Sequence, residues 1–429
     1  MAVEDCMCNL INEEKTMDEN LTREQESKLE VIAEEEANLP NARQEAIFTP
    51  TQPAEARLST SEQDRLEVLQ QQESEALKAV PNEIPTIEPD LKVSPGIISG
   101  TPNGERIDGT QASDNITALG GDDQVFGKAG NDIISGGGEN DSIEGNSGRD
   151  LIFGDFSASE NSGLVGSGND TIYGNDGNDL LYGQNREDII YGGKGKDFAE
   201  GGDGNDLIYG NQGKDTLYGD SFEGEPFSTV SGDDTVIGGG GSDLVFGGKG
   251  NDSLEGNNGK DELTGGQGND ILDGGNGKDK LIGTDTVFFA PQQFGFGAGE
   301  KDTLTGGKNN DTFVLGLAEA LTRQPDGTDG TVQDVVLYDD GNINNNGTQG
   351  FALIKDFGFP KDGVNVGVDK IQLTGSESMY SLGASPVGGI SGTGIFLEEG
   401  QNTPELIGLV EGISLDTLSL SDSTQFVFV

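Results

Sequence analysis

Two stretches, GGKGNDSLE at residues 247–255 and GGQGNDILD at residues 265–273, show the pattern that decides the fold. In each, positions 1, 2 and 4 of a nine-residue row are glycine, position 6 is aspartate and position 8 is aliphatic. Rows of this kind continue from about residue 100 to residue 314. A repeat at a fixed short period predicts a solenoid, in which each unit contacts mainly its neighbours.

The aspartates at position 6 measure how far the repeat extends. They recur every nine residues in four sets, and the sets are separated by intervals of 20, 19 and 23 residues, which exceed one row by 11, 10 and 14 residues. Position 8 is aliphatic or Phe in each row, with Ala199 as its one weak member. The position-6 aspartates are Asp114, Asp123, Asp132, Asp141, Asp150, Asp170, Asp179, Asp188, Asp197, Asp206, Asp215, Asp234, Asp243, Asp252, Asp261, Asp270, Asp279, Asp302 and Asp311.

The residue types in a row suit a metal-binding turn followed by a short strand. Glycine allows positive φ and close approach of carbonyl groups, and a hard cation such as calcium prefers six to eight oxygen ligands. The segment around position 8 then places one side chain in a core. We therefore predict that the position-6 aspartates bind Ca²⁺. The loops with Glu139, Arg186 or Asn309 at position 4 are the least secure of these sites.

A flexible, Gly- and Asp-rich linker is the alternative reading of such a composition. The aliphatic residue at every ninth place argues against it, because a flexible linker needs no apolar residue at a fixed spacing. One buried aliphatic side chain offers less stabilisation than ordering nine residues costs in backbone entropy. We therefore expect the bound metal to supply part of the folding free energy.

Residues 100–314 resemble the RTX (repeats-in-toxin) proteins of Gram-negative bacteria, with their haemolysin-type nonapeptide repeats. The resemblance implies a parallel β-roll with two rows per turn and calcium between the turns. It also implies secretion by type I (ABC transporter) machinery through an uncleaved C-terminal signal. The chain's end, SDSTQFVFV, resembles such signals in placing a few apolar residues, Phe426 to Val429, after an acidic one.

Composition excludes several classes of function. The net charge is −52, which disfavours nucleic acid and anionic lipid as partners and favours divalent cations. There is no histidine, so HExxH zinc sites, Ser-His triads and Cys-His dyads are impossible. Cys6 and Cys8 lie too close together for a disulfide framework. We expect neither an N-terminal signal peptide nor a membrane span.

Three regions follow from these patterns, in an all-β protein. Residues 1–95 are an acidic extension ending in a Pro-rich linker, with helix favoured over residues 21–38 and 61–80. It is either a partner-binding module or, as we favour, a partly disordered segment. Residues 96–316 are the β-roll, and residues 317–429 a small C-terminal β-domain that caps it and carries the secretion signal.

Three inserts interrupt the roll at the same point of the nine-residue row, and we place that point just after position 9. The first two begin with Gly-Asp, so Asp155 and Asp220 are candidates for an extra oxygen on a bound ion. The third carries Phe288, Phe289, Phe294 and Phe296, read either as a binding loop or, as we favour, as a cap for an open end of the solenoid.

Two functions from different classes remain. The favoured one is a secreted, extracellular calcium-binding protein that folds after export and is structural or associated with cell-envelope components, without enzymatic activity. The alternative is the export or stabilising module of a secreted enzyme or toxin whose active part is unrecognised. The favoured one requires no catalytic domain, and none is visible outside the roll.

Overall fold

The structure is a computed structural model of the chain. It describes residues 96–155, 167–220, 232–284, 288–289, 299–320, 322–323, 333–338, 350–358, 368–398 and 403–429. The extension of residues 1–95 lies outside these residues, as do Phe294 and Phe296, so the predictions made for them are untested.

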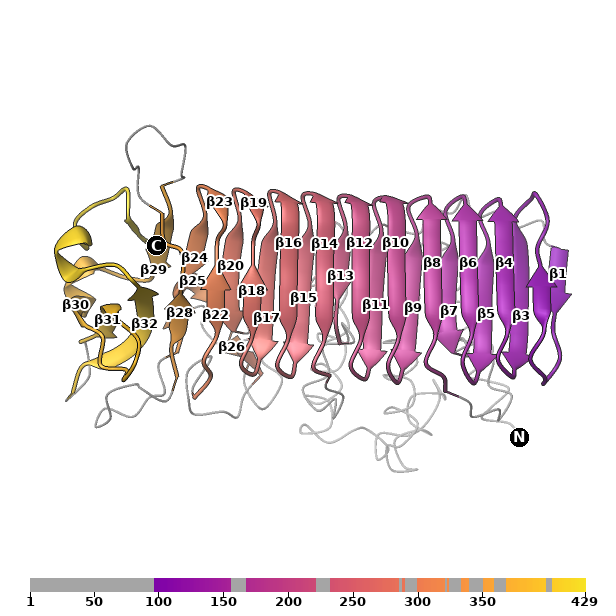
Figure 1. Cartoon of the computed structure of the whole chain (residues 1–429), viewed down its shortest axis with the longest axis horizontal. Helices are drawn as coiled ribbons and strands as arrows, with labels where there is room; N and C mark the ends of the chain where they lie inside the picture. Colours follow the sequence, from indigo (N-terminus) through magenta and orange to yellow (C-terminus); the bar gives the residue numbers. More distant parts are fainter. Residues whose placement is uncertain are drawn as a thin grey trace, which may run out of the picture. The chain divides into compact units, whose positions relative to one another are not determined.

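Two long sheets, built almost entirely of parallel strands, form the molecule (Figure 1). Sheet A contains β1 (Gly96–Ser99), β3 (Asp114–Gly120), β5 (Ile133–Gly138), β7 (Leu151–Asp155), β9 (Leu180–Asn185), β11 (Phe198–Asp203), β13 (Thr216–Tyr218), β15 (Leu244–Lys249), β17 (Glu262–Gln267), β20 (Lys280–Thr284), β24 (Thr312–Val314), β29 (Lys370–Leu373) and β33 (Phe426–Phe428).

Sheet B faces sheet A across the core. It contains β2 (Arg106–Asp108), β4 (Gln124–Ala129), β6 (Ser142–Ser147), β8 (Thr171–Asp176), β10 (Ile189–Gly195), β12 (Leu207–Gly213), β14 (Thr235–Gly241), β16 (Ser253–Gly259), β18 (Ile271–Asp273), β22 (Thr303–Thr305), β28 (Ala352–Ile354), β32 (Glu405–Glu411), β31 (Gly392–Leu397) and β30 (Tyr380–Ala384), with β19 (Asn276–Gly277) and β23 (Lys308–Asn309) beside its main path.

Successive rows alternate between the two sheets, so one turn of the roll takes two rows. Ile190 of β10 pairs with Ile172 of β8 on one side and with Ile208 of β12 on the other, each 18 residues away. Where an insert intervenes the separation grows, as in the pairing of Ile208 with Val236, but the same row positions still meet. The implied parallel β-roll with two rows per turn is confirmed.

Position 8 supplies the core. Strand side chains alternate between faces, so position 8 points inward while positions 7 and 9 point outward. Every position-8 residue from Ile116 to Phe313 is at most 1% exposed, and the weak member Ala199 is fully buried. The core is therefore a double column of aliphatic side chains along the roll.

Glycine is needed at positions 1, 2 and 4 of a row for different physical reasons. In the row of Asp270, Gly266 (position 2) and Gly268 (position 4) have φ of +117° and +140°, conformations that L residues rarely adopt. Gly265 at position 1 has no positive φ; it is needed because a Cβ there would overlap the Asp270 carboxylate. Of the two reasons given for glycine, positive φ therefore applies to positions 2 and 4, and close approach of other atoms applies to position 1.

The inserts leave the roll between positions 2 and 3 of a row, and the predicted phase after position 9 is therefore wrong by two residues. Asp155 pairs with Gly137, which is itself at position 2. The row resumes at Ser167, and the Gly168 amide donates to the Asp155 carboxylate across the insert, at 3.0 Å. Gly-Asp and Gly-Thr at the insert boundaries therefore serve as positions 1 and 2.

The C-terminal region continues the solenoid. Strands β28 and β32 extend sheet B, while β29 and β33 extend sheet A, and their buried side chains join the core of the repeats. The nine-residue repeat ends near residue 316, where the boundary was predicted, but the hydrophobic core continues beyond it. The remaining elements are a β25 (Gly316–Ala320) and β27 (Gln333–Val336) hairpin, the β21 (Phe288–Phe289) and β26 (Thr322–Arg323) pair, and two 3₁₀ turns, η2 (Glu377–Met379) and η3 (Leu415–Thr417).

Candidate metal sites

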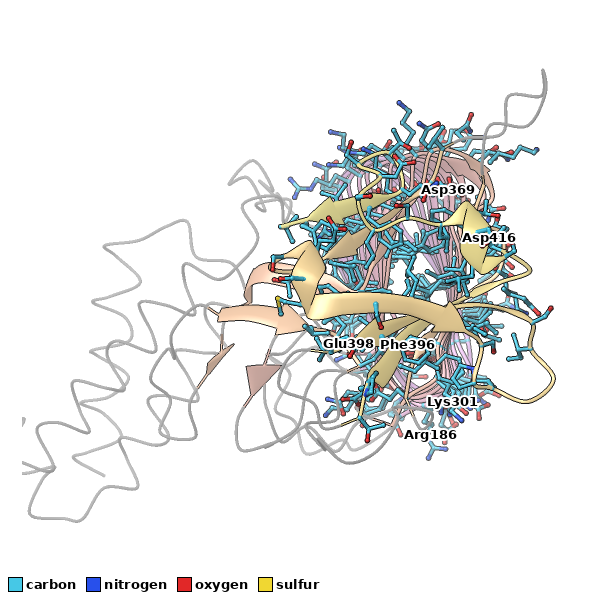
Figure 2. All side chains as sticks on the ribbon, turned by 90° about the vertical axis from the view of Figure 1, so that its left-hand side faces the viewer. Arg186, Lys301, Asp369, Phe396, Glu398 and Asp416 are labelled. Carbon is cyan, nitrogen blue, oxygen red and sulfur yellow. The ribbon has the colours of Figure 1, made fainter. Side chains whose placement is uncertain are left out.

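The position-6 aspartates form two files, one along each edge of the roll. File A precedes the strands of sheet A and file B those of sheet B. Figure 2 looks along the roll and shows Asp369, which ends file A, at one edge, and Arg186 and Lys301, from loops of file B, at the other. All the predicted aspartates are buried, at most 3% exposed.

Within a file, one carboxylate oxygen connects each turn to the next. The amide of Asp252 donates to Oδ1 of Asp270 at 2.9 Å, and the amide of Asp234 donates to Oδ1 of Asp252 at 2.8 Å. The same bond links each pair of neighbours from Asp123 to Asp302 in file B and from Asp114 to Asp369 in file A. These bonds leave the second oxygen, Oδ2, for another partner.

In seventeen of the nineteen predicted residues Oδ2 is buried and has no hydrogen-bond donor. A buried, unpaired carboxylate oxygen is strongly unfavourable, so each needs a partner that the protein does not supply. These residues are Asp123, Asp132, Asp141, Asp150, Asp170, Asp179, Asp188, Asp197, Asp206, Asp215, Asp234, Asp243, Asp252, Asp261, Asp270, Asp279 and Asp311.

All of these oxygens except that of Asp123 face a small open space, here called a cradle, beside the glycine at position 1. A Cβ added to Gly256 would lie 2.7 Å from Oδ2 of Asp261 and 2.7 Å from the carbonyl oxygen of Gly274, one turn further on. A carboxylate oxygen and a backbone carbonyl oxygen therefore converge on one small space between turns. Ala118 stands at position 1 in the row of Asp123, so that cradle already contains a methyl group.

Burial makes the carboxylates hard to ionise without a counter-ion. It raises the pKa of Asp188, Asp234 and Asp270 to about 9, with neighbouring aspartates of the same file adding to the effect. The pKa of Asp179 is raised to about 8 by burial, and Asp150 and Asp197 contribute. A cation in the cradles would remove this penalty, because it would favour the charged form.

The donor set fits calcium. A carboxylate oxygen and carbonyl oxygens are ligands that hard cations prefer, and calcium accepts many such oxygens in irregular geometry. No group of three or more acidic, Cys or His side chains converges in the part of the chain that the structure describes. The sites are instead distributed, with one carboxylate per loop and backbone carbonyls as the other donors.

The loops with unusual residues at position 4 keep the same arrangement. Glu139 and Arg186 adopt φ of +71° and +78°, in the left-handed region, whereas the glycines at this position reach larger values. Even so, Asp141 and Asp188 are buried with an unpartnered Oδ2. The geometry thus gives no reason to separate these loops from the others.

Two predicted residues differ from the rest. Asp114 accepts the amide of Thr110 on Oδ2 at 2.5 Å, and Asp302 accepts the hydroxyl of Tyr338 on Oδ2. Asp369 was missed by the sequence prediction because it follows Asp311 by 58 residues, outside the nine-residue period. Its Oδ2 accepts the amide of Gly358 at 2.6 Å.

The two aspartates at the insert boundaries have structural partners. Asp155 accepts bonds on both oxygens, from the Gly168 amide at 3.0 Å and the Asn185 side chain at 2.7 Å. Asp220 accepts the Lys249 amide at 2.5 Å on Oδ2, while its Oδ1 has no donor. Their first role is therefore to close the row across the insert, and Asp220 in addition keeps one oxygen without a donor.

A second ladder, which the sequence prediction missed, uses position 5. The amide of Asn251 donates to Asp233 at 2.7 Å and the amide of Asn269 donates to Asn251 at 3.1 Å. The signal was the frequent Asn or Asp directly before the position-6 aspartate. In this ladder the amide of the later row donates to the earlier row, the reverse of the ladder at position 6. It links successive loops on their exposed side.

Fold and site together define a class of protein: a parallel β-roll whose edges are built to hold cations between turns. The model of the RTX calcium-binding nonapeptide repeat matches residues 99–134, 126–157, 164–199, 191–223, 228–254, 255–285 and 296–317. The chain thus belongs to the calcium-binding RTX repeat family through residues 99–317, and the resemblance read from the sequence is confirmed.

Comparison with solved structures finds the crystal structure of extracellular lipase LipA from Serratia marcescens, at 16% sequence identity and a TM-score of 0.17. The match covers 70% of this chain and 40% of the lipase, so it spans less than half of that protein. No curated protein matches the chain. Within the described residues, no helix has the length and apolar character needed to cross a membrane.

Proposed function

We propose that this protein is a secreted calcium-binding RTX repeat protein with a structural or cell-surface role, whose roll folds when calcium binds outside the cell. The observation that carries the proposal is the set of seventeen buried aspartate oxygens that have no donor, fourteen of which lie beside a backbone carbonyl oxygen of the next turn. In its ionised form such an array requires a cation, and without one the carboxyl groups must hold protons.

Calcium concentration then acts as the switch for folding. Extracellular calcium modules have dissociation constants of about 10⁻⁴–10⁻³ M, so the cradles stay empty in the cytosol and fill outside the cell. Each filled cradle adds stability as RT ln(1 + [L]/Kd). Because hydrogen bonds couple the cradles along each file, small gains per site combine into a steep transition.

Export by type I secretion machinery is the second part of the proposal. The C-terminal residues that resemble a secretion signal form β33, whose Phe426 pairs with Ile371 of β29 and is 2% exposed. A transporter therefore reads this segment before the roll folds. The low cytosolic calcium that keeps the cradles empty also keeps the segment accessible.

We further propose that the protein is not an enzyme. Its sequence lacks histidine, and the buried acidic groups of the roll belong to the cradles or to the row closures. A structural or cell-envelope role needs only the folded, strongly acidic solenoid. Its location after export, in the medium or on the cell envelope, distinguishes a free from an attached component.

Deletion of either end tests the export assignment. We expect a chain lacking residues 420–429 to stay in the cell and one lacking residues 1–95 to reach the medium, each measured against the intracellular amount of the same variant. Normal export without residues 420–429, or export lost only without residues 1–95, would contradict the proposal.

A further inference from the structure

The last row of file B has its cradle filled by the protein itself. Asp302 is fully buried, and its Oδ1 accepts the amide of Asp270 at 2.9 Å like any member of the file. Its Oδ2, however, accepts the phenol O–H of Tyr338 at 2.5 Å. Tyr338 is fully buried, so this hydroxyl lies away from solvent.

The hydroxyl of Tyr338 fills a space that has an equivalent in the preceding row of file B, the row of Asp270. A Cβ added to Gly265 would overlap Oδ2 of Asp270 and the carbonyl oxygen of Gly283, and the third nearest atom is Cβ of Asp270. A Cβ added to Gly283 would overlap Oδ2 of Asp302 and the hydroxyl of Tyr338. The hydroxyl therefore lies in the space beside Gly283 that corresponds to the cradle beside Gly265.

The backbone accepts an unfavourable conformation to place this side chain. Tyr338 has a φ of +65°, in the left-handed region that non-glycine residues seldom adopt. The preceding residue is held in place, since the amide of Leu337 donates to the carbonyl of Leu315 at 3.0 Å.

The other ends of the files are closed in the same manner. At the start of file A, Asp114 accepts the amide of Thr110, and at its end Asp369 accepts the amide of Gly358. At the start of file B, Glu105 replaces aspartate and accepts the amide of Thr101. All four terminal carboxylates therefore have a local neutral protein donor, whereas Oδ2 of the interior aspartates has none.

We propose that Tyr338 closes the terminal cradle of file B, so that Asp302 holds no calcium although it is in register with the repeat. The phenol hydroxyl replaces the cation as the partner of the buried carboxylate. The inference rests on the proposed function, because it assumes that the interior cradles bind calcium. It limits the file B sites to the rows before Asp302.

Two isosteric variants of the full-length protein test this inference, with the number of calcium ions bound per chain measured by equilibrium dialysis. Asp270→Asn should bind one ion fewer than the wild type, and Asp302→Asn should bind the wild-type number. Loss of an ion in both variants would overturn the role of Tyr338. Loss in neither would overturn the calcium assignment of the cradles, and the inference with it.

Tyr338 variants give an independent readout. Tyr338→Ala removes the hydroxyl and the ring, and it should bind one ion more than the wild type; the added Asp302→Asn change should abolish that gain. Tyr338→Phe keeps the ring beside the cradle, so it should gain no ion. An unchanged number in Tyr338→Ala would overturn the inference, and if that variant does not fold, the two Asn variants still decide it.

Discussion

At the scale of the residue, the position-6 aspartate has two separate tasks. Its Oδ1 accepts the amide of the aspartate one turn earlier, and its Oδ2 faces a carbonyl oxygen in a cradle that only a glycine at position 1 leaves open. One oxygen therefore fixes the register of the turns, and the other depends on the cation.

Filling a cradle should remove one ion. Gly265→Ala places a methyl group against Oδ2 of Asp270, and overpacking of this kind costs about 1–3 kcal/mol, or about 5–150-fold in the calcium midpoint. Gly240→Ala at position 3 is the matched control, since its Cβ would meet only the Asn211 carbonyl at 3.7 Å. Equal calcium titrations of the two variants would argue against the cradle.

The pKa shifts predict how the calcium-free roll depends on pH. Burial raises the pKa of Asp179 and Asp270 to about 8 and 9, above the ordinary value near 4. The folded state therefore binds more protons, so this contribution to its stability is greatest below about pH 4 and is lost progressively as pH rises to about 9. In chelated buffer, circular dichroism should show more β-structure at pH 5 than at pH 8; the opposite order would refute this.

At the scale of the element, each row depends on its neighbours. Strand β16, which follows Asp252, is paired with β14 and β18, and Asp252 bonds to the aspartates before and after it. Asp311 also has two neighbours, but the one that follows it, Asp369, is closed by the amide of Gly358. Cooperativity should therefore be strongest in the middle of the roll.

Substitutions in the two files test this gradient. Asp252→Ala should raise the calcium midpoint for folding more than Asp270→Ala or Asp311→Ala, because Asp252 has an open cradle on both sides, whereas the rows that follow Asp270 and Asp311 are closed. Fluorescence or circular dichroism at increasing calcium measures the midpoint. The idea fails if the three variants share one midpoint.

Sequence alone predicts the elements that recur with the period. The side chain at position 8 has the same surroundings in every row, and so does the side chain at position 6. The period by itself therefore predicts that Ile190 lies in the core and Asp188 in a metal-binding loop. The contact of Tyr338 with Asp302 spans 36 residues and has no period to reveal it. The phase of the inserts was ambiguous because Gly154 suits both a row's first position and the start of a loop.

At the scale of the molecule, the described C-terminal region and the repeats form one compact unit. Strands β28, β29, β32 and β33 close the end of the core with side chains that do not depend on the cradles. The stability of the repeats depends on cations, and these end strands pair with the last repeat strands, β22 and β24, so their folding follows that of the roll. Calcium should therefore control most of the roll at once.

Calcium-dependent folding of the whole chain tests this account most directly. Far-UV circular dichroism of the full-length protein would be followed from chelated buffer through increasing calcium at neutral pH. We expect little β-structure in chelator and a cooperative gain as calcium reaches about 10⁻⁴–10⁻³ M. A full β-spectrum in chelator that calcium leaves unchanged would contradict it.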